Sequence, residues 1–240
     1  MARIGLFGGT FNPIHRGHIA VARQLRQRFP LERIYLIPAR VPPHKVSREL
    51  ATAAHRLAMI ELALEDADDT GLCLSDAELR RTGPSYTVDT VDAFRGTLDS
   101  DDRLFLIMGA DAFLELDAWR RWRALLTGVS LIVMSRPESF TGADTASDWS
   151  ALAAFAQDRL DPGYTLIEDT LIEDTLEEDT LEEDRLRLNH PQWPSIHLVR
   201  VTDWEISSRQ IRRRLSRGEN IKELVPGPVA AYIASKGLYQ

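Results

Sequence analysis

The chain alternates short apolar runs with segments of helical spacing along most of its length. Six runs have the length and composition of buried strands, at residues 4–7, 34–37, 72–74, 104–108, 131–134 and 196–199. Helical patterns occupy residues 17–29, 51–64, 88–98, 119–125, 151–157, 208–216 and 226–235. This rhythm predicts an α/β fold, a doubly wound parallel sheet with helices on both faces. Ligands of such sheets bind beyond the carboxyl ends of the strands.

Size and composition favour one soluble domain over residues 1–240. A chain of 240 residues with 44% hydrophobic content can bury a sizeable core. Cys73 is the one cysteine in the sequence, so no internal disulfide can form and a reducing cytoplasm is the expected compartment. No apolar run approaches the ~18 residues of a membrane span, and the N-terminus enters a predicted strand without a signal peptide. We therefore expect a cytoplasmic protein that does not contact membranes.

Residues 165–184 are four tandem pentads, TLIED, TLIED, TLEED and TLEED, with ten acidic residues and no base. The net charge is −7, but without the pentads 26 acidic residues remain against 29 Lys and Arg, a balance of +3. That balance suits small polyanions, whereas no basic stripe with interleaved aromatics points to nucleic acid. A period of five gathers leucines on one face of neither a helix nor a strand. We therefore expect an extended, solvated insert that catalysis does not need, with a continuous helix as the alternative.

A glycine-rich turn, GGTFNPIHRGH at residues 8–18, joins the first predicted strand to the first predicted helix. Free N–H groups and the positive end of the dipole make a helix N-terminus an anion site, and His15 and His18 lie on one face of it. The turn has neither the third glycine of the dinucleotide fingerprint nor the Gly-Lys-Ser/Thr of a Walker loop. It predicts a site for a phosphate chain. The alternative is an ordinary turn with solvated histidines.

A second motif, ISSRQIR at residues 206–212, follows the last predicted strand. Ser207 or Ser208 is a good N-cap for a helix over 211–215 and leaves donors for phosphate oxygens. Arg212 lies one turn further on and offers a fork of N–H donors. The alternative is a capped, basic surface helix. Since both motifs follow predicted strands, we expect them to lie at the same edge of the sheet.

Together the two motifs resemble the HxGH and ISSTxIR signatures of the nucleotidylyltransferase superfamily. Further segments, VPPHK at 41–45, SYT at 85–87, GAD at 109–111, Trp119, LIVMSRP at 131–137 and GLY at 237–239, resemble in this order the bacterial nicotinate mononucleotide adenylyltransferases. The resemblance covers nearly the full length and departs over 137–190, where the pentads lie. It implies a Rossmann-like fold and transfer of the adenylyl group of ATP to nicotinate mononucleotide, a step of NAD biosynthesis that gives deamido-NAD and pyrophosphate.

The resemblance also implies which residues handle ATP. The residues given catalytic roles are His15, His18, Lys45 and Arg212, with His18 as the transition-state donor and Lys45 between the phosphates of both substrates. The residues given ATP contacts are Gly8, Gly9, Thr10, Phe11, Gly109, Asp111, Ile206, Ser207 and Ser208. Thr10 is expected to orient the α-phosphate and Asp111 to accept from a ribose hydroxyl. Mg²⁺ is the expected cofactor, held by phosphates and waters rather than by a protein metal site.

Four residues are expected to bind the mononucleotide. Tyr86 and Thr87 stand at the start of a predicted helix, so their N–H groups can bind the nicotinate carboxylate. Trp119 is the stacking plate for the pyridine ring, unless it is a core tryptophan. Arg136 matches a family position near the mononucleotide phosphate, unless it forms a surface salt bridge.

Three further polar residues receive no catalytic role. No cysteine or carboxylate stands at metal-ligand spacing from His44 or His55, so both are interpreted as structural or solvated. Many superfamily members have Asp where this chain has Asn12, which keeps a carbonyl acceptor without the charge. We interpret Asn12 as a turn residue that also contacts substrate.

Two other functions fit parts of the pattern. A sibling nucleotidylyltransferase would act on phosphopantetheine or another phosphorylated small molecule. A non-catalytic nucleotide-binding protein would keep the fold and use the pentads for interaction. The expected partners are ATP and nicotinate mononucleotide, with no nucleic acid and no membrane, and assembly into a homo-oligomer stays open.

Overall fold

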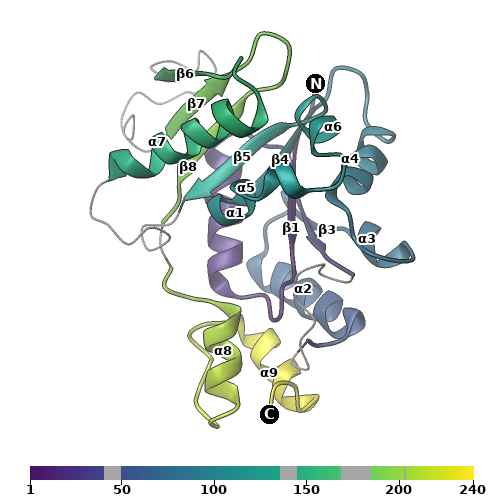
Figure 1. The fold of residues 1–240 in the computed structure, drawn as a ribbon. Helices are drawn as coiled ribbons and strands as arrows, with labels where there is room; N and C mark the ends of the chain where they lie inside the picture. The colour runs from purple at the N-terminus through teal and green to yellow at the C-terminus, as the bar shows by residue number, and fades with distance from the viewer. Residues whose placement is uncertain (41–49, 136–144, 169–184, 203) are drawn as a thin grey trace. The chain divides into compact units, whose positions relative to one another are not determined.

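The computed structural model describes residues 1–40, 50–135, 145–168, 185–202 and 204–240 (Figure 1). They form two compact units. Unit 1 comprises Met1–Gly5 and Tyr86–Asp203, and unit 2 comprises Leu6–Ser85 and Trp204–Gln240. The first strand, β1 (Arg3–Gly9), begins in unit 1 and ends in unit 2. The single domain expected over 1–240 stays a prediction.

Unit 2 carries both predicted phosphate motifs. Besides the end of β1, its elements are α1 (Arg16–Arg28), β2 (Arg33–Pro38), α2 (Ala53–Ala67), β3 (Leu72–Leu74), α3 (Ala77–Arg80), α8 (Ser208–Leu215) and α9 (Gly227–Ser235). The strand order is β3-β2-β1, and β2 runs parallel to β3 with Ile34 opposite Leu72. Helices α1 and α2 pack against β2, and α9 packs against α2. The last helix of the chain therefore lies beside elements of the N-terminal third (Figure 1).

Within unit 1 the strand order is β4-β5-β8-β7-β6. Its elements are α4 (Thr87–Arg95), β4 (Arg103–Gly109), α5 (Ala110–Phe113), the 3₁₀ turn η1 (Leu116–Ala118), α6 (Trp122–Leu126), β5 (Ser130–Ser135), α7 (Thr145–Phe155), the π-helical turn η3 (Ala156–Leu160), β6 (Thr165–Glu168), β7 (Arg185–Asn189) and β8 (Ile196–Arg200). Strands β4, β5 and β8 are parallel. Leu131, Ile132 and Val133 of β5 have no exposed surface, as expected for a parallel strand covered on both faces.

All six predicted strands are present, so the prediction of a doubly wound, mostly parallel α/β sheet is confirmed. The sheet differs from the prediction at one edge, where β7 is antiparallel to both β8 and β6. Only six residues, 190–195, connect β7 to β8. That is too short for the crossover of a dozen or more residues that a parallel pair needs.

The helix predicted over 119–125 is wrong in its first turn. Trp119 is extended at the end of η1, and Arg121 has φ 52° in the left-handed region, so α6 begins only at Trp122. Two helices escaped prediction, α3 and α5, because four residues are too few to show a helical period.

The first four residues of the first pentad form a strand. Residues Thr165–Glu168 form β6, which pairs with β7 so that Thr165 faces Asn189 and Glu168 faces Leu186. Leu166 and Ile167 are exposed, which agrees with the expected solvation. Residues 169–184 lie outside the described residues, so the rest of the insert stays a prediction.

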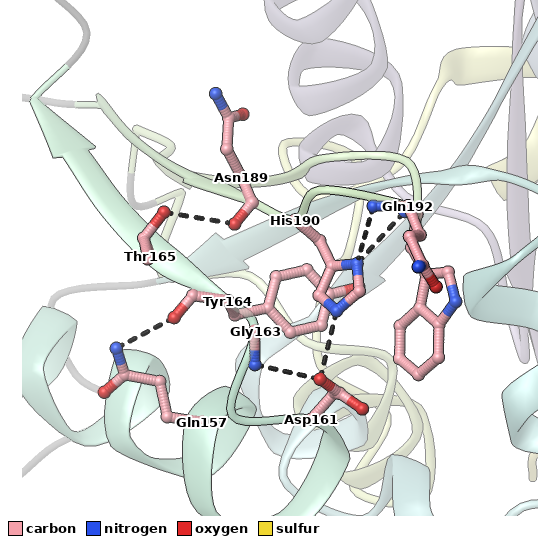
Figure 2. A network of polar contacts seen from close by, with 9 residues as sticks. Gln157, Asp161, Gly163, Tyr164, Thr165, Asn189, His190 and Gln192 are labelled. Carbon is pink, nitrogen blue, oxygen red and sulfur yellow. Dashed lines mark hydrogen bonds and ion pairs between the residues drawn. The ribbon is translucent and has the colours of Figure 1, made fainter.

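A polar network stands at the base of this hairpin (Figure 2). His190 Nδ1 accepts from the backbone N–H groups of Gln192 and Trp193, both at 3.1 Å. Its Nε2 therefore carries the proton and donates to Asp161 Oδ1 at 3.0 Å. The N–H of Gly163 donates to the same oxygen at 2.8 Å, and these two bonds, that of Gly163 first, hold the pKa of Asp161 below its usual value. Since both ring nitrogens form hydrogen bonds, we interpret His190 as a structural residue that connects the end of β7 to the turn before β6.

The register of the hairpin gives a clean test of the insert. Replacing residues 169–185 by Asn-Gly joins Glu168 to Leu186 by a two-residue turn that suits antiparallel strands. We expect the melting temperature, the elution volume on a sizing column and the activity implied by the resemblance to stay close to wild type, with kcat within a few-fold. A matched deletion of 165–184 also removes β6 and should melt earlier, because it uncovers the edge of β7. A folded but inactive Asn-Gly variant would contradict a dispensable insert.

Buried His197 on β8 makes unit 1 sensitive to acid. Burial first, and then the positive charges of Arg185, Arg187 and Arg3, lower the pKa of His197 from 6.5 to about 3. Below pH 6.5 His197 binds a proton in the unfolded chain but not in the folded chain, so the free energy of unfolding falls as the pH drops toward 3. The loss from this group is about 1.4 kcal/mol per pH unit. His197→Asn should therefore lose less stability than wild type between pH 7.5 and 5 in urea unfolding. Parallel losses would show that His197 is not the group responsible.

Candidate active site

The two histidines of the first motif stack on each other where α1 begins. His15 is the N-cap of α1 and is 3% exposed. Its ring lies 3.6 Å from that of His18, with 27° between the planes. The backbone N–H of His15 donates to His18 Nδ1 at 3.2 Å. Because Nδ1 accepts, Nε2 of His18 carries the proton and is a hydrogen-bond donor.

Aromatic rings pack around His18. Phe11 meets it edge-on at 5.0 Å between centroids, and Phe7 does so at 6.4 Å. Phe11 is buried and has φ 47°, a left-handed backbone that costs a non-glycine residue of order 1–3 kcal/mol. Strain of this kind persists only where the surroundings impose it. The structure thus places Phe11, expected among the ATP contacts, in the packing around His18.

The glycines of the motif leave room for these rings. A Cβ on Gly17 would lie 3.1 Å from His15 Nδ1 and 3.3 Å from Trp204 Cβ, and a Cβ on Gly9 would lie 3.0 Å from the Phe11 ring. Gly8 is exposed, and a Cβ there would meet nothing within 4 Å. The HxGH spacing therefore has a steric basis: any side chain at 17 presses on His15.

Within unit 2, the second motif lies against the first. Ser207 is the N-cap of α8 and accepts from Gln210 N at 3.1 Å. The Ser208 hydroxyl donates to the Pro13 carbonyl at 2.8 Å, and Arg212 Nη1 donates to the Asn12 carbonyl at 2.9 Å. Segments some 200 residues apart in sequence are thereby joined. Ile206 is half-buried just before the cap.

Arg56 on α2 is a structural residue that the sequence pattern did not single out. It is 1% exposed and donates to the carbonyls of Thr10 at 3.0 Å, Ala51 at 3.2 Å and Arg40 at 3.3 Å. Burial lowers the pKa of its guanidinium. The available signal was a lone arginine among the apolar residues of α2. Through these bonds Arg56 links the half-buried Thr10 to Arg40 and Ala51. His44 and Lys45, which lie between Arg40 and Ala51 in sequence, are outside the described residues.

Asn12 is a structural acceptor. It is 6% exposed, and its Oδ1 accepts from Ala51 N at 3.0 Å and from Tyr239 Oη at 2.6 Å. The expectation that Asn12 is a turn residue holds, whereas its contact with substrate stays a prediction. His55 bonds to Tyr232 Oη through Nδ1 at 2.9 Å, in line with its structural interpretation.

Unit 1 carries the residues expected to bind the adenosine and the mononucleotide. Tyr86 is the N-cap of α4 and Thr87 its first residue, with the Arg120 guanidinium 4.6 Å above the Tyr86 ring. Trp119 is half-buried, so it is not a fully enclosed core side chain.

Gly109 and Asp111 meet at the end of β4. Gly109 caps α5, and a Cβ on it would lie 2.4 Å from Asp111 Oδ1, so a side chain at position 109 would displace the Asp111 carboxylate. Asp111 itself is exposed. Arg136 lies outside the described residues.

Unit 2 also contains a cationic cavity of about 690 Å³. Its lining residues are Leu50, Ala51, Thr52, His55, Arg209, Arg212, Arg213, Ser216, Gly237, Leu238, Tyr239 and Gln240. Over the described part of the chain, no group of His, Cys, Asp and Glu is placed to hold a metal ion. The described helices include none long and apolar enough to cross a membrane.

Comparison with known proteins places the chain in a family. The family model described as cytidylyltransferase-like matches residues 6–214. A protein of Pseudomonas fluorescens named "Probable nicotinate-nucleotide adenylyltransferase" is 35% identical over 99% of this chain and 97% of its own length. A protein of Desulfatibacillum aliphaticivorans with the same name is 34% identical over 99% of both chains.

The fold is shared with solved structures at lower identity. Plasmodium falciparum nicotinic acid mononucleotide adenylyltransferase complexed with NaAD has a TM-score of 0.67 at 16% identity, covering 100% of this chain and 98% of that one. The same protein complexed with APC has a TM-score of 0.66. The chain belongs to the cytidylyltransferase-like family and, within it, to the nicotinate-nucleotide adenylyltransferases that these relatives represent.

Substituting Gly17 tests the steric basis of the motif. Gly17→Ala should leave the melting temperature near wild type, because alanine gains about 1 kcal/mol of helix propensity against the crowding of His15. Displacement of His15 should weaken ATP binding about tenfold, or 1.4 kcal/mol, in calorimetry. Gly227→Ala, in open space at the start of α9, is the matched control and should bind ATP normally. Unchanged ATP affinity in Gly17→Ala would show that the position of His15 is irrelevant to the phosphates.

Proposed function

We propose that the protein transfers the adenylyl group of ATP to nicotinate mononucleotide, giving deamido-NAD and pyrophosphate. The observation that carries this proposal is the stacked His15–His18 pair at the start of α1, tied to the ISSRQIR helix. Relatives named for this activity match 99% of the chain.

The reaction asks for positioning rather than for a nucleophilic side chain. A phosphate oxygen of the mononucleotide attacks the α-phosphorus of ATP, the bond from that phosphorus to the bridging oxygen of the β-phosphate breaks, and pyrophosphate leaves with the electron pair. The attacking oxygen is already anionic at neutral pH, so no Ser or Cys must be deprotonated. What the protein supplies is alignment and donors for the charge on the transferring group.

The donors of unit 2 fit the triphosphate. His18 Nε2–H, fixed by the bond at Nδ1, would meet the α-phosphate as its charge grows. His15, Thr10, Lys45 and the start of α8 with Ser207 and Ser208 would bind the remaining oxygens. Arg212 donates one N–H to the Asn12 carbonyl. A guanidinium has five N–H donors, and others of them would bind the β- and γ-phosphates.

Residues of unit 1 fit the rest of the two substrates. The free N–H groups at the start of α4, at Tyr86 and Thr87, would take the nicotinate carboxylate, and Trp119 would stack on the pyridine ring. Asp111 would accept from a ribose hydroxyl, and Arg136 would approach the mononucleotide phosphate.

Mg²⁺ would enter with ATP. The first motif and the start of α8 offer imidazoles, hydroxyls and a guanidinium group, which suit phosphate better than Mg²⁺, an ion that prefers carboxylate and phosphate oxygens. The Asn12 side-chain oxygen already accepts two hydrogen bonds. The ion would therefore be held by phosphates and waters and would neutralise their charge.

An acceptor panel tests the function. The protein is incubated with ATP, Mg²⁺ and nicotinate mononucleotide, nicotinamide mononucleotide, phosphopantetheine or glycerol phosphate, and pyrophosphate is measured. We expect release with nicotinate mononucleotide, and less with the amide, which gains less from the positive end of a helix. Release with phosphopantetheine alone would identify a sibling transferase. ATP binding without release for any acceptor would identify a binding protein.

His18→Ala tests the proposed donor. We expect kcat to fall roughly 100-fold or more while the affinity for ATP changes little, because the donor strengthens its bond in the transition state. Steady-state kinetics and calorimetry separate the two quantities. His55→Ala, which loses the hydrogen bond and the ring contact with Tyr232, is the control and should keep its kcat. A loss of ATP affinity at unchanged kcat would reduce His18 to a ground-state contact.

A further inference from the structure

The C-terminal tail reaches the phosphate loop through one hydrogen bond. Tyr239 lies next to the last residue and donates its hydroxyl to Asn12 Oδ1 at 2.6 Å across 227 positions of sequence. Its φ of 65° is left-handed, which a tyrosine adopts only where its surroundings hold it. The tail is thus fixed in a costly conformation that brings the phenol to Asn12.

Asn12 gathers bonds from three segments of unit 2. Its Oδ1 accepts from Tyr239 Oη and from the N–H of Ala51, just before α2. Its backbone carbonyl accepts from Arg212 on α8. Removing the phenol would leave one acceptor position of a nearly buried amide without its donor, which costs more than the net value of an ordinary hydrogen bond.

The phenol is a permanent donor. Burial raises the pKa of Tyr239, and this outweighs the lowering effect of the nearby Arg212 and Arg56 charges. The hydroxyl therefore stays protonated across the pH range of any practical assay, and it always donates to Asn12.

The position of Asn12 makes this bond important for chemistry. Asn12 follows the strained Phe11 and stands three residues before His15, in the loop whose carbonyls are held by Arg56, Arg212 and Ser208. A loop with a left-handed residue relaxes when its restraints are removed. Errors of about 1 Å in the alignment of reacting groups cost up to 100-fold in rate.

We propose that Tyr239 is a positioning residue for adenylyl transfer, which acts through the Asn12 side chain to hold the phosphate loop and its histidines in register. The proposal rests on the proposed function. Tyr239 would act through Asn12 rather than by binding a substrate itself. It assigns the tail a role in the rate of the reaction, beyond covering the apolar core.

The first test compares two tyrosines of the same segment. Tyr239→Phe removes only the hydroxyl, and Tyr232→Phe removes the hydroxyl that bonds to His55. We expect Tyr239→Phe to lower kcat about tenfold with KM for ATP within twofold and with kcat flat over pH 7–9 relative to wild type, while Tyr232→Phe keeps its kcat. Rates are measured well below the melting temperature of each variant. Equal kcat values for wild type and Tyr239→Phe would overturn the proposal.

A double-mutant cycle shows whether Tyr239 acts through Asn12. Asn12→Ala and Tyr239→Phe should each lower kcat, and the double variant should be no slower than the slower single one. Multiplied losses would overturn the proposal. Asn12→Asp keeps an acceptor, so it should retain kcat within a few-fold. In that background Tyr239→Phe should cost at least as much as in wild type, because a carboxylate binds the phenol more strongly. This pair decides the matter if Asn12→Ala does not fold.

A readout without turnover separates this proposal from the proposed function. The ring resonances of His15 and His18 should shift in NMR spectra of Tyr239→Phe and stay in place in Tyr232→Phe. If wild type transfers no adenylyl group but the resonances shift, the function is wrong and the positioning contact stands. If wild type is active and the resonances and kcat of Tyr239→Phe are unchanged, the positioning role is wrong and the function stands.

Discussion

The arrangement of unit 2 depends on hydrogen bonds to the carbonyls of one loop. The loop between β1 and α1 turns at Phe11, which has a left-handed backbone. Arg56, Arg212 and Ser208 donate to the carbonyls of Thr10, Asn12 and Pro13. A buried carbonyl without a partner costs free energy comparable to a lost hydrogen bond. These donors therefore stabilise the strained turn that precedes α1, whose N-terminal end carries the two histidines.

The same bonds explain why the two phosphate motifs belong together. The sequence alone predicts that the second motif binds a ligand, but in the structure Ser208 and one N–H of Arg212 donate to carbonyls of the first motif. Arginine suits this double task because its rigid fork has five donors, so binding a carbonyl leaves others for an anion. The proposed role of Tyr239 extends this principle, since a third segment also supports the loop through Asn12.

Much of the fold followed from pattern. Alternating apolar and helical segments predicted six of the strands, because a strand buried on both faces must be apolar throughout. Strands β6 and β7 were missed because their sequences, TLIE and RLRLN, are short and half-polar, without the continuous apolar run of a buried parallel strand. The first turn of the helix predicted over 119–125 failed because Arg121 adopts a left-handed backbone that no local pattern indicates.

The sequence by itself determined the chemistry on offer: two imidazoles at a helix start, a serine cap with an arginine one turn on, and their order along the chain. Local rules suffice for this, since caps and helix ends are built from neighbouring residues. Only the tertiary structure decided which side chains hold the site. Arg56 carries no motif-like signal, and the motifs that contain Asn12 and Tyr239 do not indicate that these two residues bond to each other, yet burial favours a partner for each polar atom. Such partners are chosen by packing in three dimensions, which spacing along the chain does not encode.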